Sequence, residues 1–82
     1  MDYYLTKHAK LRMAERGISN QLLDKALHNP TEILYDNNGR ELYKYIYTKG
    51  SKKRLLIIAV ASEKNKLKII TVIDTSKIRK YL

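Results

Sequence analysis

The chain has 82 residues, of which 17 are Lys or Arg and eight are Asp or Glu, so its formal net charge is +9. A chain of this length forms one domain with a thin core, and residues 1–82 are expected to fold as a single unit. The absence of cysteine excludes disulfides and thiolate chemistry. No apolar run is long enough to cross a bilayer and no apolar signal region opens the chain, which predicts a soluble, cytoplasmic protein. For the same reason no membrane partner is expected, and the excess of cations favours a polyanion such as RNA as the partner.

Two helices are predicted in the first third of the chain. Thr6 is a typical N-cap and Gly17 a typical C-cap, which bounds a first helix at about Lys7–Arg16. Ser19 is suited to cap a second helix, whose apolar residues recur at helical spacing. That helix must end before Pro30.

After Pro30 the apolar pattern changes from the period of a helix to the period of a strand. Four strands are predicted, at residues 31–36, 41–48, 54–62 and 67–74, with a tight hairpin turn at residues 37–39. The third strand is apolar on both faces and is therefore central. The sequence predicts an α+β fold in which two helices pack on one face of a four-stranded antiparallel β-meander. It leaves open whether residues 3–5 add a short strand and whether the tail after residue 75 is a helical turn or a loose end.

The first helix carries a stripe of three basic side chains, His8, Arg12 and Arg16, spaced four residues apart and therefore on one face. At 100° per residue, the apolar residues Leu11 and Met13 lie on either side of this stripe. We therefore expect the stripe to point towards the sheet or along its edge rather than straight into water.

Two roles stay open for this stripe. Internal partners such as Glu15, Asp74 or strand carbonyls would make it a structural brace. A bound phosphate would make it a site, because guanidinium groups hold phosphate through paired hydrogen bonds. In that role His8 would take a proton from a 2′-hydroxyl of RNA, since histidine is the residue type best suited to acid–base chemistry at neutral pH. Arg12 and Arg16 would stabilise the charge that develops on the phosphorus centre, and no metal would be needed.

Other kinds of site have little support in the sequence. His8 and His28 lie on different helices with no carboxylate cluster near them, so no metal site is expected. The chain has three glycines and no glycine-rich phosphate loop, and no Ser or Cys stands in a nucleophile motif. We therefore expect no cofactor.

Tyrosines alternate along the second predicted strand, at Tyr43, Tyr45 and Tyr47. A row of this kind either stacks nucleic-acid bases or packs under a helix, and packing is the favoured interpretation. Tyr81 stands in a basic tail that either contacts phosphate or frays.

Three motifs together resemble a known family. Residues 8–19 read H-A-x-x-R-M-x-x-R-G-I-S, the second helix ends in Asn29 and Pro30, and the last strand contains I-T-V at residues 70–72. With these motifs the sequence resembles, over nearly its whole length, a small bacterial and archaeal domain family of uncharacterised function. That family is in turn distantly similar in layout to the RelE and BrnT type of toxins.

The resemblance implies one RelE/BrnT-like domain, and the motif positions that carry over are His8, Arg12 and Arg16 on the helix and Thr71 on the last strand. Such toxins are metal-independent ribonucleases held by an antitoxin protein. Because RelE-like toxins use basic and aromatic side chains of the sheet and the C-terminal segment, the resemblance also points to three further residues, Arg54, Tyr47 and Tyr81.

The leading hypothesis is therefore a metal-independent endoribonuclease toxin, or a descendant of one, that binds RNA at a basic cleft with His8, Arg12 and Arg16 as its catalytic residues. One alternative is a non-catalytic nucleic-acid-binding module, in which Arg12 and Lys53 contribute to affinity. Another is a protein-interaction module that holds an acidic, antitoxin-like partner. The sequence leaves the oligomeric state open.

Overall fold

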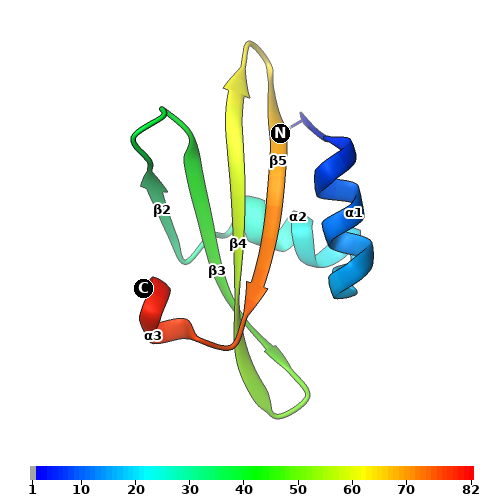
Figure 1. Cartoon of the computed structure of the whole chain (residues 1–82), viewed down its shortest axis with the longest axis vertical. Coiled ribbons are helices and arrows are strands. Elements are labelled where there is room, and N and C mark those ends of the chain that lie inside the picture. Colours follow the sequence, from blue (N-terminus) through cyan, green and yellow to red (C-terminus); the bar gives the residue numbers. More distant parts are fainter. Residues whose placement is uncertain (1) are drawn as a thin grey trace.

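The computed structural model describes residues 2–82 and has an α+β fold, which confirms the predicted class (Figure 1). Five strands and three helices are formed within these residues. In chain order they are β1 (Asp2–Leu5), α1 (Lys7–Arg16), α2 (Asn20–His28), β2 (Glu32–Tyr35), β3 (Glu41–Lys49), β4 (Lys52–Glu63), β5 (Lys66–Thr75) and α3 (Ile78–Tyr81). None of these helices is long and apolar enough to cross a membrane.

The strands form one mixed sheet in the order β1-β5-β4-β3-β2, rather than the expected four-stranded antiparallel sheet. Strands β2 to β5 pair antiparallel with their neighbours in the chain. The fifth strand is β1, which pairs in parallel with the first half of β5, from Asp2 opposite Lys66 to Leu5 opposite Ile69. This pairing joins segments about 64 residues apart, so no local pattern in the sequence reveals it.

Side-chain caps define the helices where the sequence predicts them. The Thr6 hydroxyl accepts a hydrogen bond from the Ala9 amide at 3.1 Å, and the Ser19 hydroxyl accepts one from the Leu22 amide at 3.1 Å. Gly17 ends α1 with φ at 65°, a left-handed conformation that suits glycine. The chain can therefore turn sharply between α1 and α2, and both helices cover the same face of the sheet.

The main core lies between this face and the two long helices. Ala9 and Met13 of α1 are buried against it, as are Leu23, Ala26 and Leu27 of α2. Ile18 adds a buried side chain from the link between the helices. The strands supply the other large buried side chains, which are Tyr43, Leu56, Ile58, Val60, Leu67, Ile69 and Val72. Tyr45 and Tyr47 pack against the same cluster, which confirms that the tyrosine row is mainly a packing surface.

The opposite face of the sheet is covered in part by the C-terminal tail, whose last residues form the short helix α3 (Figure 1). Leu55 and Ile57 of β4 are buried on this face. The Lys44 ammonium group donates a hydrogen bond to the Tyr81 carbonyl and so ties α3 to β3. Strand β4 is therefore buried on both faces, as its apolar sequence predicts.

Candidate nucleic-acid interface

A tyrosine, an arginine and an aspartate from three neighbouring strands meet on the helix-covered face of the sheet. Tyr47 of β3 lies opposite Arg54 of β4, and Asp74 of β5 lies opposite the nearby Leu56. The Arg54 Nε lies 3.0 Å from Oδ2 and 3.2 Å from Oδ1 of Asp74. The Tyr47 hydroxyl donates to Oδ1 of Asp74 at 2.7 Å. Asp74 is only 8% exposed, so these bonds compensate a charge that water reaches poorly.

The hydrogen bonds to Asp74 affect the protonation of Tyr47 and hold the side chain of Arg54 in place. Burial, together with the hydrogen bond to Asp74, raises the pKa of Tyr47 to about 12, so its hydroxyl remains a donor at neutral pH. Arg54 is held to Asp74 through Nε, and its guanidinium group also interacts with the Tyr47 hydroxyl, which counteracts part of the rise in the Tyr47 pKa. Because the Arg54 side chain is 28% exposed, the cluster holds a guanidinium group whose outer edge meets solvent.

Beyond this cluster, the tip of the β3–β4 hairpin is strongly basic. Lys49 lies opposite Lys52, Lys53 lies opposite Thr48, and the three lysines are exposed. The sequence has no Asp or Glu between Leu42 and Ser62. The long hairpin extends past the rest of the sheet, at the bottom of Figure 1. Its lysines therefore stand in solvent with no acidic neighbour in their own hairpin.

The tail adds three more exposed cations, Lys77, Arg79 and Lys80. It leaves β5 just after Thr75, which lies opposite Leu55 at the base of the same hairpin. We call the hairpin and tail cations together the basic end, defined as Lys49, Lys52, Lys53, Lys77, Arg79 and Lys80. None of them forms an ion pair within the described residues.

The four residues expected to bind nucleic acid are divided between the two faces of the sheet. Arg54 and Tyr47 are on the face covered by α1 and α2, and both contact Asp74. Lys53 alternates with Arg54 along β4 and so points to the other face, on which α3 places Tyr81. The Lys80 ammonium group lies 5.6 Å from the centroid of the Tyr81 ring. The structure thus brings Arg54 and Tyr47 together, and it keeps Lys53 and Tyr81 apart from them.

The expected direction of the His8, Arg12 and Arg16 stripe is wrong for most of its length. His8 and Arg16 are exposed, and the residues of α1 that face the sheet are Ala9 and Met13. The physical reason is that Ala9 and Met13 also lie four residues apart, so α1 buries an apolar pair and leaves the charged stripe at its flank.

Arg12 is the stripe residue with an internal partner. Its Nη1 lies 3.5 Å from Oε1 of Glu15, and both side chains are well exposed, so this pair is weak. Asp74, the other carboxylate considered as a partner for the stripe, is bound to Arg54 instead. Among residues 2–82, no hydrogen bond or ion pair joins the stripe to the Arg54 cluster or to the basic end. Thr71, the motif residue of the last strand, is half-buried opposite Ala59 on the other side of the sheet.

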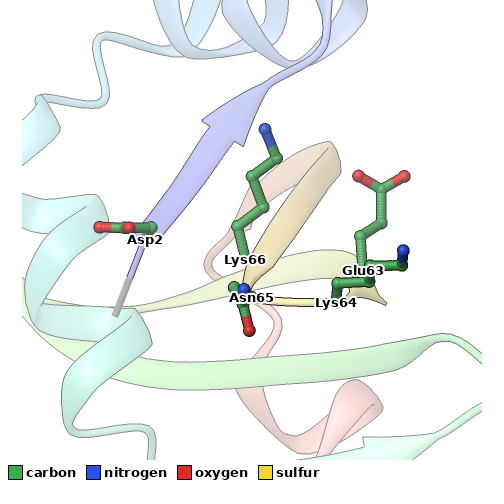
Figure 2. A pocket seen from close by; sticks show the side chains of 5 residues that line it. All are labelled: Asp2, Glu63, Lys64, Asn65 and Lys66. Atoms are coloured by element: carbon green, nitrogen blue, oxygen red, sulfur yellow. The ribbon is translucent and has the colours of Figure 1, made fainter.

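A surface cavity of about 430 Å³ lies at the opposite end of β5, beside β1 (Figure 2). Glu63 and Lys66 point the same way from the β4–β5 turn, and Asp2 lies across from them on β1. The charges of Glu63 and Lys66 already have a partner in Tyr4. Glu63 accepts a hydrogen bond from the Tyr4 hydroxyl at 2.8 Å, and the Lys66 ammonium group lies 4.9 Å from the centre of the Tyr4 ring. None of the predicted site residues lines this cavity.

Residues 2–82 also contain no group of three His, Cys, Asp or Glu side chains arranged to hold a metal ion. The basic end and the Arg54 cluster present cations and tyrosine hydroxyls. Such groups bind phosphate through charge-assisted hydrogen bonds.

Comparison with known proteins places the chain in a family. The family model described as a domain of unknown function (DUF4258) matches residues 5–74, which include α1, α2, β2, β3, β4 and β5 except its last residue, but only Leu5 of β1 and nothing of α3. The chain belongs to the DUF4258 family. This membership confirms the resemblance to a small uncharacterised domain family. No curated protein and no solved structure matches the chain.

The DUF4258 match ends at Asp74, so it includes the Arg54 cluster and the hairpin but not the tail. Sequence reasoning pointed to Arg54, Tyr47 and Lys53 without identifying Asp74 as the partner of the first two. It also did not single out Lys49 and Lys52. The signal that reveals these lysines is the absence of acidic residues from Leu42 to Ser62.

Proposed function

We propose that this protein binds RNA through the basic end. The observation that carries the proposal is the concentration of six exposed cations on the hairpin tip and the tail, with no ion pair to any of them in the described residues. Phosphate groups release condensed counterions when lysine and arginine neutralise them, and this release supplies most of the affinity of such surfaces.

The charge of the whole chain supports the same proposal. Of the 17 Lys and Arg residues, only Arg12, Lys44 and Arg54 form ion pairs within residues 2–82. Of the acids near the basic end, Asp74 is buried and bound to Arg54, and Glu32 is paired with Lys44. The basic end therefore presents a positive potential that internal carboxylates do not cancel.

Within this proposal the Arg54 cluster contacts the phosphate backbone next to the hairpin lysines. Asp74 orients the guanidinium group through Nε, and the Arg54 Nη groups, which do not bond to Asp74, are the atoms that contact a phosphate. Lys53 and Tyr81 act on the other face of the hairpin, where Tyr81 is 39% exposed and a base stacks on the ring face away from Lys80.

A binding assay with two triple variants tests the proposal. Lys49→Gln/Lys52→Gln/Lys53→Gln removes three cations from the basic end. The matched control Lys7→Gln/Lys10→Gln/Lys25→Gln removes three exposed cations from α1 and α2 and leaves the same net charge. Affinity for a fluorescent single-stranded RNA is measured by anisotropy over a series of salt concentrations.

For the hairpin variant, the slope of log affinity against log salt should fall by about 0.7 for each cation that contacts a phosphate, or roughly 2 in all. The helix variant should keep nearly the slope of the wild type. Equal losses in both variants would show that only net charge matters and would refute a localised site.

A second candidate function is RNA cleavage, and it rests on the exposure of the α1 stripe. His8 and Arg16 are open to solvent and Arg12 has one weak pair, so a bound phosphate would meet little competition from internal acids. In this second proposal the α+β arrangement is RelE-like, and the protein is a metal-independent endoribonuclease toxin or a descendant of one. His8 removes the proton of the 2′-hydroxyl, and an acidic antitoxin-like protein covers the basic surface.

Cleavage of labelled RNA in excess EDTA distinguishes this second proposal from binding alone. His8→Ala should lower the cleavage rate by roughly 10²- to 10⁴-fold and leave RNA affinity unchanged. If neither protein cleaves any RNA, or both cleave it equally, the ribonuclease proposal fails while the binding proposal keeps its own test.

A further inference from the structure

Strand β2 forms one outer edge of the sheet (Figure 1), and its side chains are unusually apolar for an open edge. Ile33 and Leu34 are each 40% exposed, and Tyr35 is 74% exposed. Proteins normally protect such an edge with lysine, proline or a bulge, because an open edge pairs readily with another strand. The four residues of β2 include no lysine, arginine or proline.

The backbone hydrogen bonds show which groups of β2 point outward. The Asp36 amide donates to the Arg40 carbonyl at 2.9 Å, so these two residues form a hydrogen-bonded pair at the end of the ladder. Such pairs alternate along antiparallel strands, which makes Leu34 and Leu42 the next one. The amide and carbonyl groups of Ile33 and Tyr35 are therefore directed away from β3, towards the open edge.

We propose that two copies of this chain associate by antiparallel pairing of β2 with β2. Leu34 lies on the two-fold axis and faces Leu34 of the second copy. Ile33 of each copy then pairs with Tyr35 of the other, and the outward amides and carbonyls form four hydrogen bonds. The two five-stranded sheets become one continuous sheet of ten strands. This proposal is independent of RNA binding.

Side-chain placement supports this register. A two-fold axis perpendicular to the sheet keeps each face of the sheet on the same side in both copies. Both Leu34 side chains therefore meet on the α3 face, and each Ile33 lies across from a Tyr35 on the helix-covered face. Every exposed apolar side chain of β2 gains an apolar neighbour, so the edge is complementary to itself.

Charge acts in two ways at this edge. Residues 31–42 contain three acids and one cation in a chain of net charge +9, so this edge is less basic than the chain as a whole. Antiparallel pairing about Leu34 places Asp36 of one copy opposite Glu32 of the other, and these like charges repel. Glu32 lies 4.0 Å from Lys44 of its own copy, which offsets part of this repulsion. The pairing is therefore favoured by its apolar contacts and backbone hydrogen bonds rather than by charge.

Strand β2 is short, so the dimer is weak and depends on concentration. Stable interfaces bury about 1,200–2,000 Å², more than four residues on each side provide.

The absence of cysteine allows a direct test by cross-linking. In Leu34→Cys the only thiols are the two that face each other across the axis, where Cα atoms of a non-hydrogen-bonded pair are about 4.5 Å apart and within disulfide reach. The matched control is Leu11→Cys, an exposed leucine on α1. Leu34→Cys should form the disulfide dimer at least about tenfold faster than Leu11→Cys, because the paired edge raises the effective thiol concentration.

The molar mass in solution provides the second measurement. Wild-type protein in sedimentation equilibrium should shift with rising concentration from the 9.6 kDa of one chain towards twice that mass. Leu34→Lys places two like charges on the axis and should remain monomeric, whereas Leu11→Lys should behave as the wild type. A wild-type chain that stays monomeric at millimolar concentration would refute the proposal and assign the edge to a different partner. Disulfide formation by Ile33→Cys that outpaces Leu34→Cys would refute the register.

Discussion

Asp74 is the only acidic residue after Glu63, and it satisfies two side chains at once. It accepts the Nε of Arg54 and the hydroxyl of Tyr47, so three adjacent strands are joined by charge-assisted hydrogen bonds at the base of the basic hairpin. Removing the carboxylate would leave a partly buried guanidinium group without its counter-ion. At the scale of single residues, this cluster links the fold to the candidate interface.

The first prediction concerns the charge of Asp74. Asp74→Asn should lower the free energy of unfolding by about 1–3 kcal/mol, since the bonds lost are to a charged partner that is partly shielded from water. The matched control is Glu15→Gln, which breaks the exposed Arg12 pair and should cost under about 0.5 kcal/mol. Urea denaturation followed by circular dichroism measures both values. Equal costs would show that the cluster is no stronger than a surface ion pair.

The second prediction concerns the pH dependence of Tyr47. Its pKa is raised to about 12 in the folded chain, so folding favours the protonated phenol, and the stability gained is complete below pH 10. That stability should be lost as pH rises from about 10 towards 12. Tyr47→Phe should therefore lose less stability than the wild type over this interval. In an absorbance titration at 295 nm the variant should lack one of the late-ionising tyrosines; an unchanged titration would contradict the prediction.

At the scale of elements, the sequence predicts helix ends reliably, because these depend on neighbouring residues. It does not predict which distant strands pair. Thr6, Gly17 and Ser19 marked the helix ends correctly because a cap depends on residues at most a few positions away. The parallel pairing of β1 with β5 depends on contacts between the two ends of the chain, which leave no local pattern. The orientation of α1 was misjudged because Ala9 and Met13 are its only buried residues, and so small an apolar pair gives a weak signal beside three basic residues.

The third prediction concerns how Thr6 attaches α1 to the sheet. Its hydroxyl accepts from the Ala9 amide and donates to the Ile70 carbonyl at 3.0 Å, where β5 has a residue without a partner in β4. Thr6→Ala should therefore destabilise the fold by about 1–2 kcal/mol. Ser19→Ala removes a cap that makes a single helix bond and should cost less, about 0.5–1 kcal/mol. Chemical denaturation compares the two, and Thr6→Ser should restore most of the loss. A larger cost for Ser19→Ala would contradict this role of Thr6.

At the scale of the whole molecule, charge is distributed unevenly over a sheet with two covered faces. The basic end gathers six cations on the hairpin and tail, whereas the acidic residues lie mostly around β2, the turns at the other end and the helices. The total charge was readable from composition, and it correctly indicated a cationic surface. The location of the cationic surface was not readable from composition, because it depends on how far β3 and β4 extend past the sheet and on where the tail leaves β5.

The fourth prediction follows from this unbalanced charge. The chain has a net charge of +9 and three ion pairs in the described residues. Repulsion among its cations should therefore destabilise the folded state by more than the ion pairs stabilise it. Salt at about 0.1 M screens charges beyond roughly 10 Å, so moderate salt should raise the melting temperature. A gain of about 1 kcal/mol would raise it by roughly 4–8 °C in a domain of this size. Lys49→Gln/Lys52→Gln/Lys53→Gln relieves repulsion directly, so its melting temperature should be higher at low salt and should respond less to added salt. A melting temperature that falls with salt would show instead that the few ion pairs outweigh the repulsion, and that the basic end is tolerated without cost to the fold.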